Sequence, residues 1–178
     1  MGPRETMNVC SGCGGRFADA PGGTVHRYME SSPGCWAAYG EVLAREYEQP
    51  AFFQAHQFTV DAYAVQHPGR PSPQSIQSVA VHLIRLCLTL EHGASVEAAT
   101  AVMHSATQRK DAFHWLEPPP SQGGVTAANV HRAASPQERA VQVRAWAEVA
   151  WAAWAAHHDT VRGWIDACRE SHLPNKRA

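Results

Sequence analysis

The sequence predicts an all-α protein, a helical bundle of about five helices that follows an irregular N-terminal arm. Serine followed by proline occurs at 32–33, 72–73 and 135–136, and a serine N-cap with proline in the first turn is a common helix start. Apolar residues after these starts recur every three or four positions, as they do on the buried face of a helix. No segment alternates convincingly between apolar and polar residues as a strand would.

The expected helices have the approximate ranges 33–49, 50–67, 73–92, 96–109 and 136–168. Ser95 is the expected cap of the fourth helix, and Gly93 ends the third as a C-terminal glycine. Residues 110–134 contain the run WLEPPPSQGG and are expected to be irregular. We expect three parts, which are a zinc-binding arm at 1–35, a bundle at 36–172 against which it packs, and a tail at 173–178.

Composition limits the classes of function. Of 178 residues, 44% are apolar and 17% are charged, which is typical of a folded domain. The formal net charge of −1 indicates no nucleic-acid partner. No apolar run is long enough for a membrane span, and the N-terminus lacks the apolar stretch of a signal peptide. We therefore expect a cytoplasmic protein with no membrane contact, while the oligomeric state stays open.

The clearest local signal is the segment CSGCGG at residues 10–15, which we call the cysteine loop. Two thiolates separated by two residues can wrap one metal ion in a tight turn, and zinc prefers this geometry. Further donors lie downstream, so the expected zinc ligands are Cys10, Cys13, His26 and Cys35. If Ser32 caps the first helix, Cys35 occupies the third helical position, where the helix dipole favours a thiolate.

Two other interpretations of the CxxC spacing are a redox-active pair and chance. No βαβ pattern accompanies the motif, which disfavours a thioredoxin-like role. The number of cysteines is odd, which argues against a disulfide framework. Cys87 and Cys168 lie within apolar helical patterns, where we expect them to be buried packing residues.

A second set of polar residues lies on the expected helices. His56, Asp61 and His67 belong to the second helix and His82 to the third. Side chains from facing helices often build sites inside bundles, and His67 directly precedes a Pro-Gly turn at the mouth of the bundle. We expect these four residues to line one polar cavity. A hydrogen-bonded packing role is the alternative for each histidine taken alone.

The segments HRYMESSPGCWAAYGEVLAREY, VDAYAVQHPG and SVAVHLIRLCLTLE resemble an uncharacterised bacterial family of domains of unknown function. In that family a cysteine knuckle precedes motifs of the SSPGCW and VDAYxxQHPG types. The resemblance covers most of residues 10–160. It implies the family's fold and transfers no activity. It also implies a shared role for Cys10, Cys13, His26, Cys35, Asp61, His67 and His82.

Two functions from different classes fit these features. One is a metal-dependent enzyme, in which bound metal activates water to hydrolyse a small molecule and the catalytic residues are His67, Asp61, His56 and His82. The other is a zinc-stapled binding or interaction module without catalysis. The polar groups of VDAYAVQHPG favour the enzyme. The coordination number separates the two, because a saturated Cys₃His site is structural whereas an open position permits chemistry.

Overall fold

The computed structural model describes residues 6–108 and 110–170, and the expected tail at 173–178 lies outside them. The expected all-α bundle is confirmed. Within the described ranges the elements are β1 (Met7–Val9), β2 (Arg16–Ala18), α1 (Pro33–Glu48), α2 (Pro50–Phe53), α3 (His56–Gln66), α4 (Pro73–Leu90), α5 (Val96–Thr107), η1 (Lys110–Ala112), α6 (Ala127–Arg132), α7 (Pro136–Ala153), η2 (Ala155–His157) and α8 (His158–Glu170). No helix among the described residues is long and apolar enough to cross a membrane.

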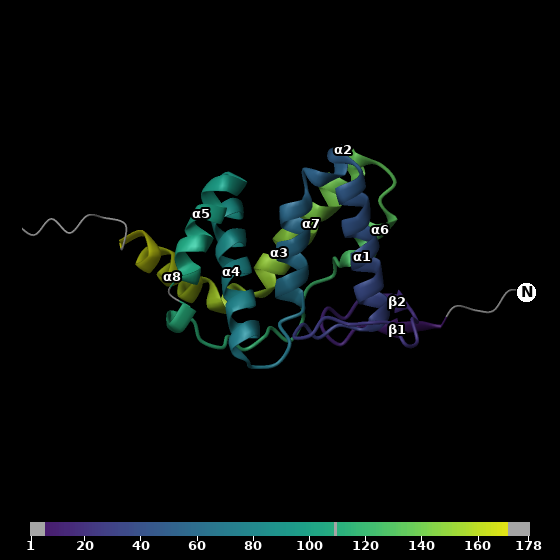
Figure 1. Cartoon of the computed structure of the whole chain (residues 1–178), viewed down its shortest axis with the longest axis horizontal. Coiled ribbons are helices and arrows are strands. Elements are labelled where there is room, and N and C mark those ends of the chain that lie inside the picture. The colour runs from purple at the N-terminus through teal and green to yellow at the C-terminus, as the bar shows by residue number, and fades with distance from the viewer. Residues whose placement is uncertain (1–5, 109, 171–178) are drawn as a thin grey trace, which may run out of the picture.

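Helices α3 and α7 occupy the middle of the molecule (Figure 1). On one side α3 packs against α4, which also contacts α5 and α8. On the other side lie α1, α2 and α6, with α1 packed against α6. The hairpin of β1 and β2 lies at the N-terminal end of α1, so the N-terminal segment covers one corner of the bundle.

The four expected serine caps are confirmed. In each case the hydroxyl accepts a hydrogen bond from the backbone N–H three residues later, and the caps are Ser32, Ser72, Ser95 and Ser135. Each cap satisfies a first-turn N–H that has no partner inside the helix. These bonds are local, which explains why the sequence alone locates the helix starts.

A two-stranded hairpin was not expected from the sequence. Strand β1 pairs antiparallel with β2, and Asn8 lies opposite Phe17. Each strand has three residues and only Phe17 is buried, so the alternation is too short to recognise. The hairpin matters because its connecting loop is the cysteine loop.

The helix expected at 50–67 is two helices, α2 and α3, so the prediction of one continuous helix was wrong. The carboxylate of Glu46 in α1 is fully buried. It accepts hydrogen bonds from His56 Nδ1 at 2.9 Å and from Thr59 Oγ1 at 2.7 Å. These bonds hold the first turn of α3 against α1, and residues 54–55 separate α2 from α3.

The expected helix at 136–168 also consists of two helices, α7 and α8. The ring of His158 stacks on Trp151 with 3.7 Å between centroids, and its Nε2 donates to the Trp151 carbonyl at 3.0 Å. His157 Nε2 donates to the carbonyl of Glu117 at 2.8 Å. These contacts lie at η2 (Ala155–His157), the short 3-10 helix that separates α7 from α8, and at the first residue of α8. As expected, Cys87 and Cys168 are buried.

Residues 110–134 are more ordered than expected, since they contain η1 and α6. The buried amide of Gln66 at the end of α3 holds the segment that leads into α6. Its nitrogen donates to the carbonyls of Gln122 and Val125 at 2.8 and 2.9 Å, and its oxygen accepts from Trp146 Nε1 at 2.7 Å. Gln66 therefore joins α3, α7 and the loop before α6.

We expect Gln66→Leu to lower the free energy of unfolding by about 3 kcal/mol, because two carbonyls and an indole N–H lose their partner at roughly 1–3 kcal/mol each. Urea denaturation measures this loss. The matched control is Gln74→Leu at an exposed position of α4, which should stay within about 0.5 kcal/mol of the parent. Equal stability of the two variants would contradict the role given to Gln66.

Candidate metal centre

The cysteine loop is the turn of the β1–β2 hairpin. The backbone N–H of Cys10 donates to the carbonyl of Gly15 at 2.8 Å, and that of Gly14 donates to the carbonyl of Cys10 at 2.9 Å. Gly14 has φ +71°, a conformation that glycine adopts at no steric cost. The tight turn buries the side chains of both Cys10 and Cys13.

Cys35 comes from the first turn of α1. Its N–H donates to the Ser32 hydroxyl at 3.2 Å, and its side chain is fully buried. The N–H of Ser32 points at Cys10 Sγ, 3.3 Å away. The start of α1 therefore supplies one thiol and a backbone donor to the thiol of Cys10.

His67 follows the last residue of α3 and is 1% exposed. Its Nδ1 donates to the carbonyl of Tyr63 at 2.7 Å, which leaves the lone pair on Nε2. Nε2 lies 3.4 Å from Cys35 Sγ and 3.6 Å from Cys10 Sγ. The hydrogen bond to Tyr63 thus orients the ring with Nε2 toward the thiols of Cys10 and Cys35.

Four donor atoms meet at one buried point. The Sγ atoms of Cys13 and Cys35 are 3.9 Å apart, and all four donors lie within 4.8 Å of one another. We call this set, which comprises Cys10, Cys13, Cys35 and His67, the Cys₃His cluster. Gly12 permits the close approach, because a Cβ there would lie 2.5 Å from His67 Cδ2. The cluster can hold a metal ion.

The thiols of the cluster do not ionise independently. Hydrogen bonds from Cys13 and Cys35 lower the pKa of Cys10 below its ordinary value. The contact with Cys10, together with burial, raises the pKa of Cys13 to about 12, and the same causes raise that of Cys35. The protein environment alone thus stabilises one thiolate, whereas a divalent cation would stabilise three.

His26, the expected fourth ligand, does not lie in the cluster. Its ring packs edge-on against Tyr28, with 4.4 Å between centroids, and 5.2 Å from the ring of Trp36. Burial lowers its pKa. His67 takes its place because the end of α3 reaches the cysteine loop, a contact that spacing along the chain cannot reveal. The position of His67 before Pro68-Gly69 made it a candidate site residue, but as a member of the expected catalytic set rather than as a metal ligand.

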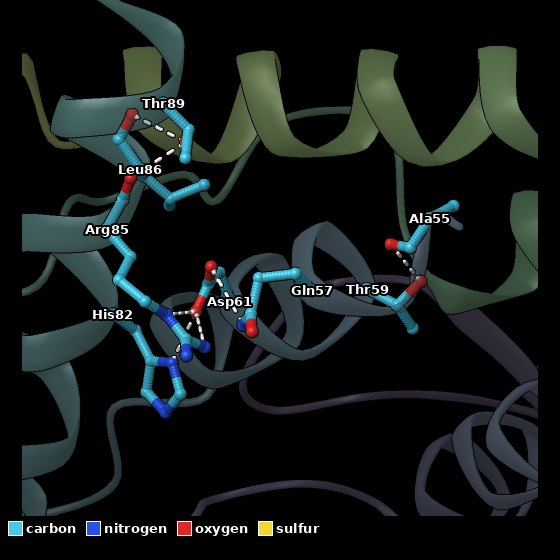
Figure 2. A network of polar contacts seen from close by, with 8 residues as sticks. All are labelled: Ala55, Gln57, Thr59, Asp61, His82, Arg85, Leu86 and Thr89. Atoms are coloured by element: carbon cyan, nitrogen blue, oxygen red, sulfur yellow. Dashed lines mark hydrogen bonds and ion pairs between the residues drawn. The ribbon is translucent and has the colours of Figure 1, made fainter. Parts of the chain in front are cut away.

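The expected catalytic residues are divided among separate networks. His67 belongs to the Cys₃His cluster, and His56 bonds to Glu46. Asp61 is fully buried and accepts hydrogen bonds from His82 Nδ1 at 2.7 Å and from Arg85 Nε at 3.0 Å (Figure 2). The structure therefore brings Asp61 and His82 together but not all four residues. Their catalytic role stays a prediction.

The Asp61 network ties α3 to α4. Arg85 also donates to Asp61 through Nη2, and Gln57 Nε2 donates to the second carboxylate oxygen at 3.3 Å (Figure 2). Arg85 is 7% exposed, and it is not among the site residues expected from the sequence. The feature that could have identified it is its charge, three positions after His82 in an otherwise apolar stretch.

A cavity of about 690 Å³ opens beside the Cys₃His cluster. The cysteine loop, the proline-rich loop at 118–124 and α6 form its walls, and Cys13 is among the lining residues. None of the four expected catalytic residues lines it.

A family model described as "Family of unknown function (DUF5946)" matches residues 8–155. The chain belongs to this DUF5946 family. This confirms the expected membership in an uncharacterised domain family, and the matched range includes the whole Cys₃His cluster. No curated protein matches the DUF5946 chain. No solved structure matches it.

We expect His67→Ala to lower metal affinity by more than about 100-fold, because loss of an outer hydrogen bond alone costs roughly 10–100-fold at metal sites and His67 is in direct reach of the ion. His26→Ala is the matched control and should keep the metal. Elemental analysis after dialysis against a chelator measures both. Metal loss from the His26 variant alone would restore the ligand set expected from the sequence.

Asp61→Asn should lower the free energy of unfolding by about 3–5 kcal/mol, since it leaves the buried Arg85 guanidinium without its counter-charge. Glu148→Gln is the control. Glu148 pairs with Arg144 at 2.6 Å with both side chains about half exposed, and such pairs contribute about 0.5 kcal/mol. Thermal and urea unfolding should show a larger loss of stability for Asp61→Asn than for Glu148→Gln. The reverse order would contradict the role given to the Asp61–Arg85 pair.

Proposed function

We propose that this DUF5946 chain is a zinc-stabilised helical binding module with no catalytic activity of its own. The observation that carries the proposal is the saturated, buried donor set of three thiols and one imidazole. Structural zinc sites have four protein ligands of these types, whereas catalytic zinc sites keep a position for water or substrate.

The donor spacing supports zinc in particular. A tetrahedral ion with metal–sulfur bonds of about 2.3 Å and metal–nitrogen bonds of about 2.0 Å needs S···S edges of about 3.8 Å and S···N edges of about 3.5 Å. The corresponding distances are 3.9 Å between Cys13 and Cys35, and 3.4 and 3.6 Å from His67 to Cys35 and Cys10. Thiolate and imidazole are also the donors that zinc prefers.

Zinc at this point joins three segments that are distant in sequence. The cysteine loop, the start of α1 and the end of α3 each supply a ligand. The hairpin has two strands of three residues, and a hairpin of that size is not stable alone in water. Zinc binding therefore supplies free energy for folding of the N-terminal segment.

The hydrolase remains the alternative, and it requires an open coordination position or a second metal. Four protein donors complete a tetrahedral shell. Among the described residues, the second group of potential metal ligands is Cys87, Glu91 and His92, and it contains none of the expected catalytic residues. Both observations favour the binding module over the enzyme.

Protein purified without added metal should contain one zinc per chain, and X-ray absorption at the zinc edge should fit three sulfur ligands and one nitrogen. Cys10→Ser with Cys13→Ser should lose the zinc and much of the stability, because ligation and folding are coupled. Cys168→Ala, a buried cysteine outside the cluster, should keep the zinc. A coordinated water, or a double variant with unchanged zinc and melting temperature, would refute the structural role.

A further inference from the structure

The cavity beside the Cys₃His cluster is suited to a ligand. Its volume of about 690 Å³ lies within the range of small-molecule sites, roughly 300–1,000 Å³. It is lined by glycines, prolines and polar side chains, with no aromatic residue among them. Recognition there must rest on charge and hydrogen bonds, since no ring is available for stacking.

Gln122 supplies a hydrogen-bonding group that is not satisfied by the protein. It lines the cavity and is 7% exposed, and its Oε1 has no hydrogen-bond partner among the described residues. The residue is held in place by the bond from Gln66 Nε2 to its carbonyl. A buried amide oxygen without a partner is unfavourable. The oxygen itself is buried, so a rotation of the side-chain amide toward the cavity is needed to bring it to a donor on a ligand.

Two guanidinium groups supply positive charge from different walls. Arg16 lies at the start of β2 and Arg132 at the end of α6, and both are exposed and line the cavity. Neither makes an ion pair with another described residue. Glu30 is the acidic side chain on the lining, so the local charge is positive although the whole chain carries −1.

The positive charge extends along the same face. A smaller cavity of about 360 Å³ shares Glu30 and Gly69 with the first and adds Arg27 and Arg70 to its lining. These two arginines likewise pair with no described carboxylate. The surroundings of the larger cavity therefore attract anions from solution.

We propose that the 690 Å³ cavity binds a small organic anion, with a carboxylate or phosphate between Arg16 and Arg132 and an N–H or O–H donor on Gln122 Oε1. The inference rests on the proposed binding function and names its ligand class. Arginine forms paired hydrogen bonds with either anion.

Ligand binding and zinc binding are linked through the cysteine loop. Residues 11–16 form one wall of the cavity, and two ligands of the cluster, Cys10 and Cys13, flank or belong to that segment. Removing zinc releases this wall, so the anion should bind only to the zinc-loaded protein. By reciprocity, the bound anion should raise zinc affinity by the same factor.

Isothermal titration of the zinc-loaded protein with glycerol 3-phosphate and, separately, with glutamate tests the proposal. Each probe carries an anion and a donor, and binding of one equivalent of either supports the site and identifies the anion. Inorganic phosphate, which lacks the organic part, should bind at least tenfold more weakly than glycerol 3-phosphate. Equal binding of the two phosphates would show charge attraction only and overturn the role of Gln122.

Variants locate the binding. Gln122→Met keeps the side-chain volume, and Arg16→Met and Arg132→Met change exposed positions. Each should weaken the binding at least tenfold while zinc content is unchanged. Arg144→Met, in α7 and outside the cavity lining, should bind as the parent does.

The result that overturns the proposal is zinc-loaded protein that binds neither probe at millimolar concentration, or that binds one unaffected by the three variants. In that case the structural zinc can still be present with three sulfur and one nitrogen ligands. Failure of the proposed function can be told apart from this result, because the protein would then lack zinc or show a zinc-coordinated water before any probe is added.

Discussion

Three thiols and one imidazole, buried at a single point, are the constraint on which the N-terminal third of the molecule depends. The ligands come from the cysteine loop, the start of α1 and the end of α3. Without a cation the protein environment favours one thiolate, since the contacts that lower the pKa of Cys10 raise those of Cys13 and Cys35. A divalent ion, which we propose to be zinc, would remove this conflict and hold the segment by coordination bonds.

Helix α3 connects this centre to the rest of the bundle. Asp61 binds Arg85 and His82 of α4, Gln66 binds the loop before α6, and His67 completes the cluster. These side chains point to different neighbours although they lie within two turns of one helix. The polar residues of the motif VDAYAVQHPG are therefore explained by three separate tertiary contacts. A plain bundle helix would not need them, and a catalytic site is not required to explain them.

The cavity in which we propose an anion lies between the cysteine loop, the proline-rich loop at 118–124 and α6. The zinc site that we propose fixes one wall, and Gln66 fixes the loop that carries Gln122. Loops positioned by rigid supports are common places for binding residues. A chain with little net charge can present the anion site that we propose, because Arg16 of β2 and Arg132 of α6 both line this cavity.

The sequence by itself determined the four serine-capped helix starts, the all-α class and three of the four cluster residues. Serine caps act on N–H groups three residues away, and a CxxC spacing closes a turn on itself, so both are visible in a short window. Tertiary structure alone decided that His67 rather than His26 joins the cysteines, that Glu46 and His158 interrupt two expected helices, and that Gln122 faces a cavity. The choice of His67 and the placement of Gln122 depend on contacts between residues far apart along the chain, Cys35 with His67 and Gln66 with Gln122. The two interruptions come with shorter-range side-chain contacts, of His56 with Glu46 and of His158 with Trp151, which the helical periodicity does not predict.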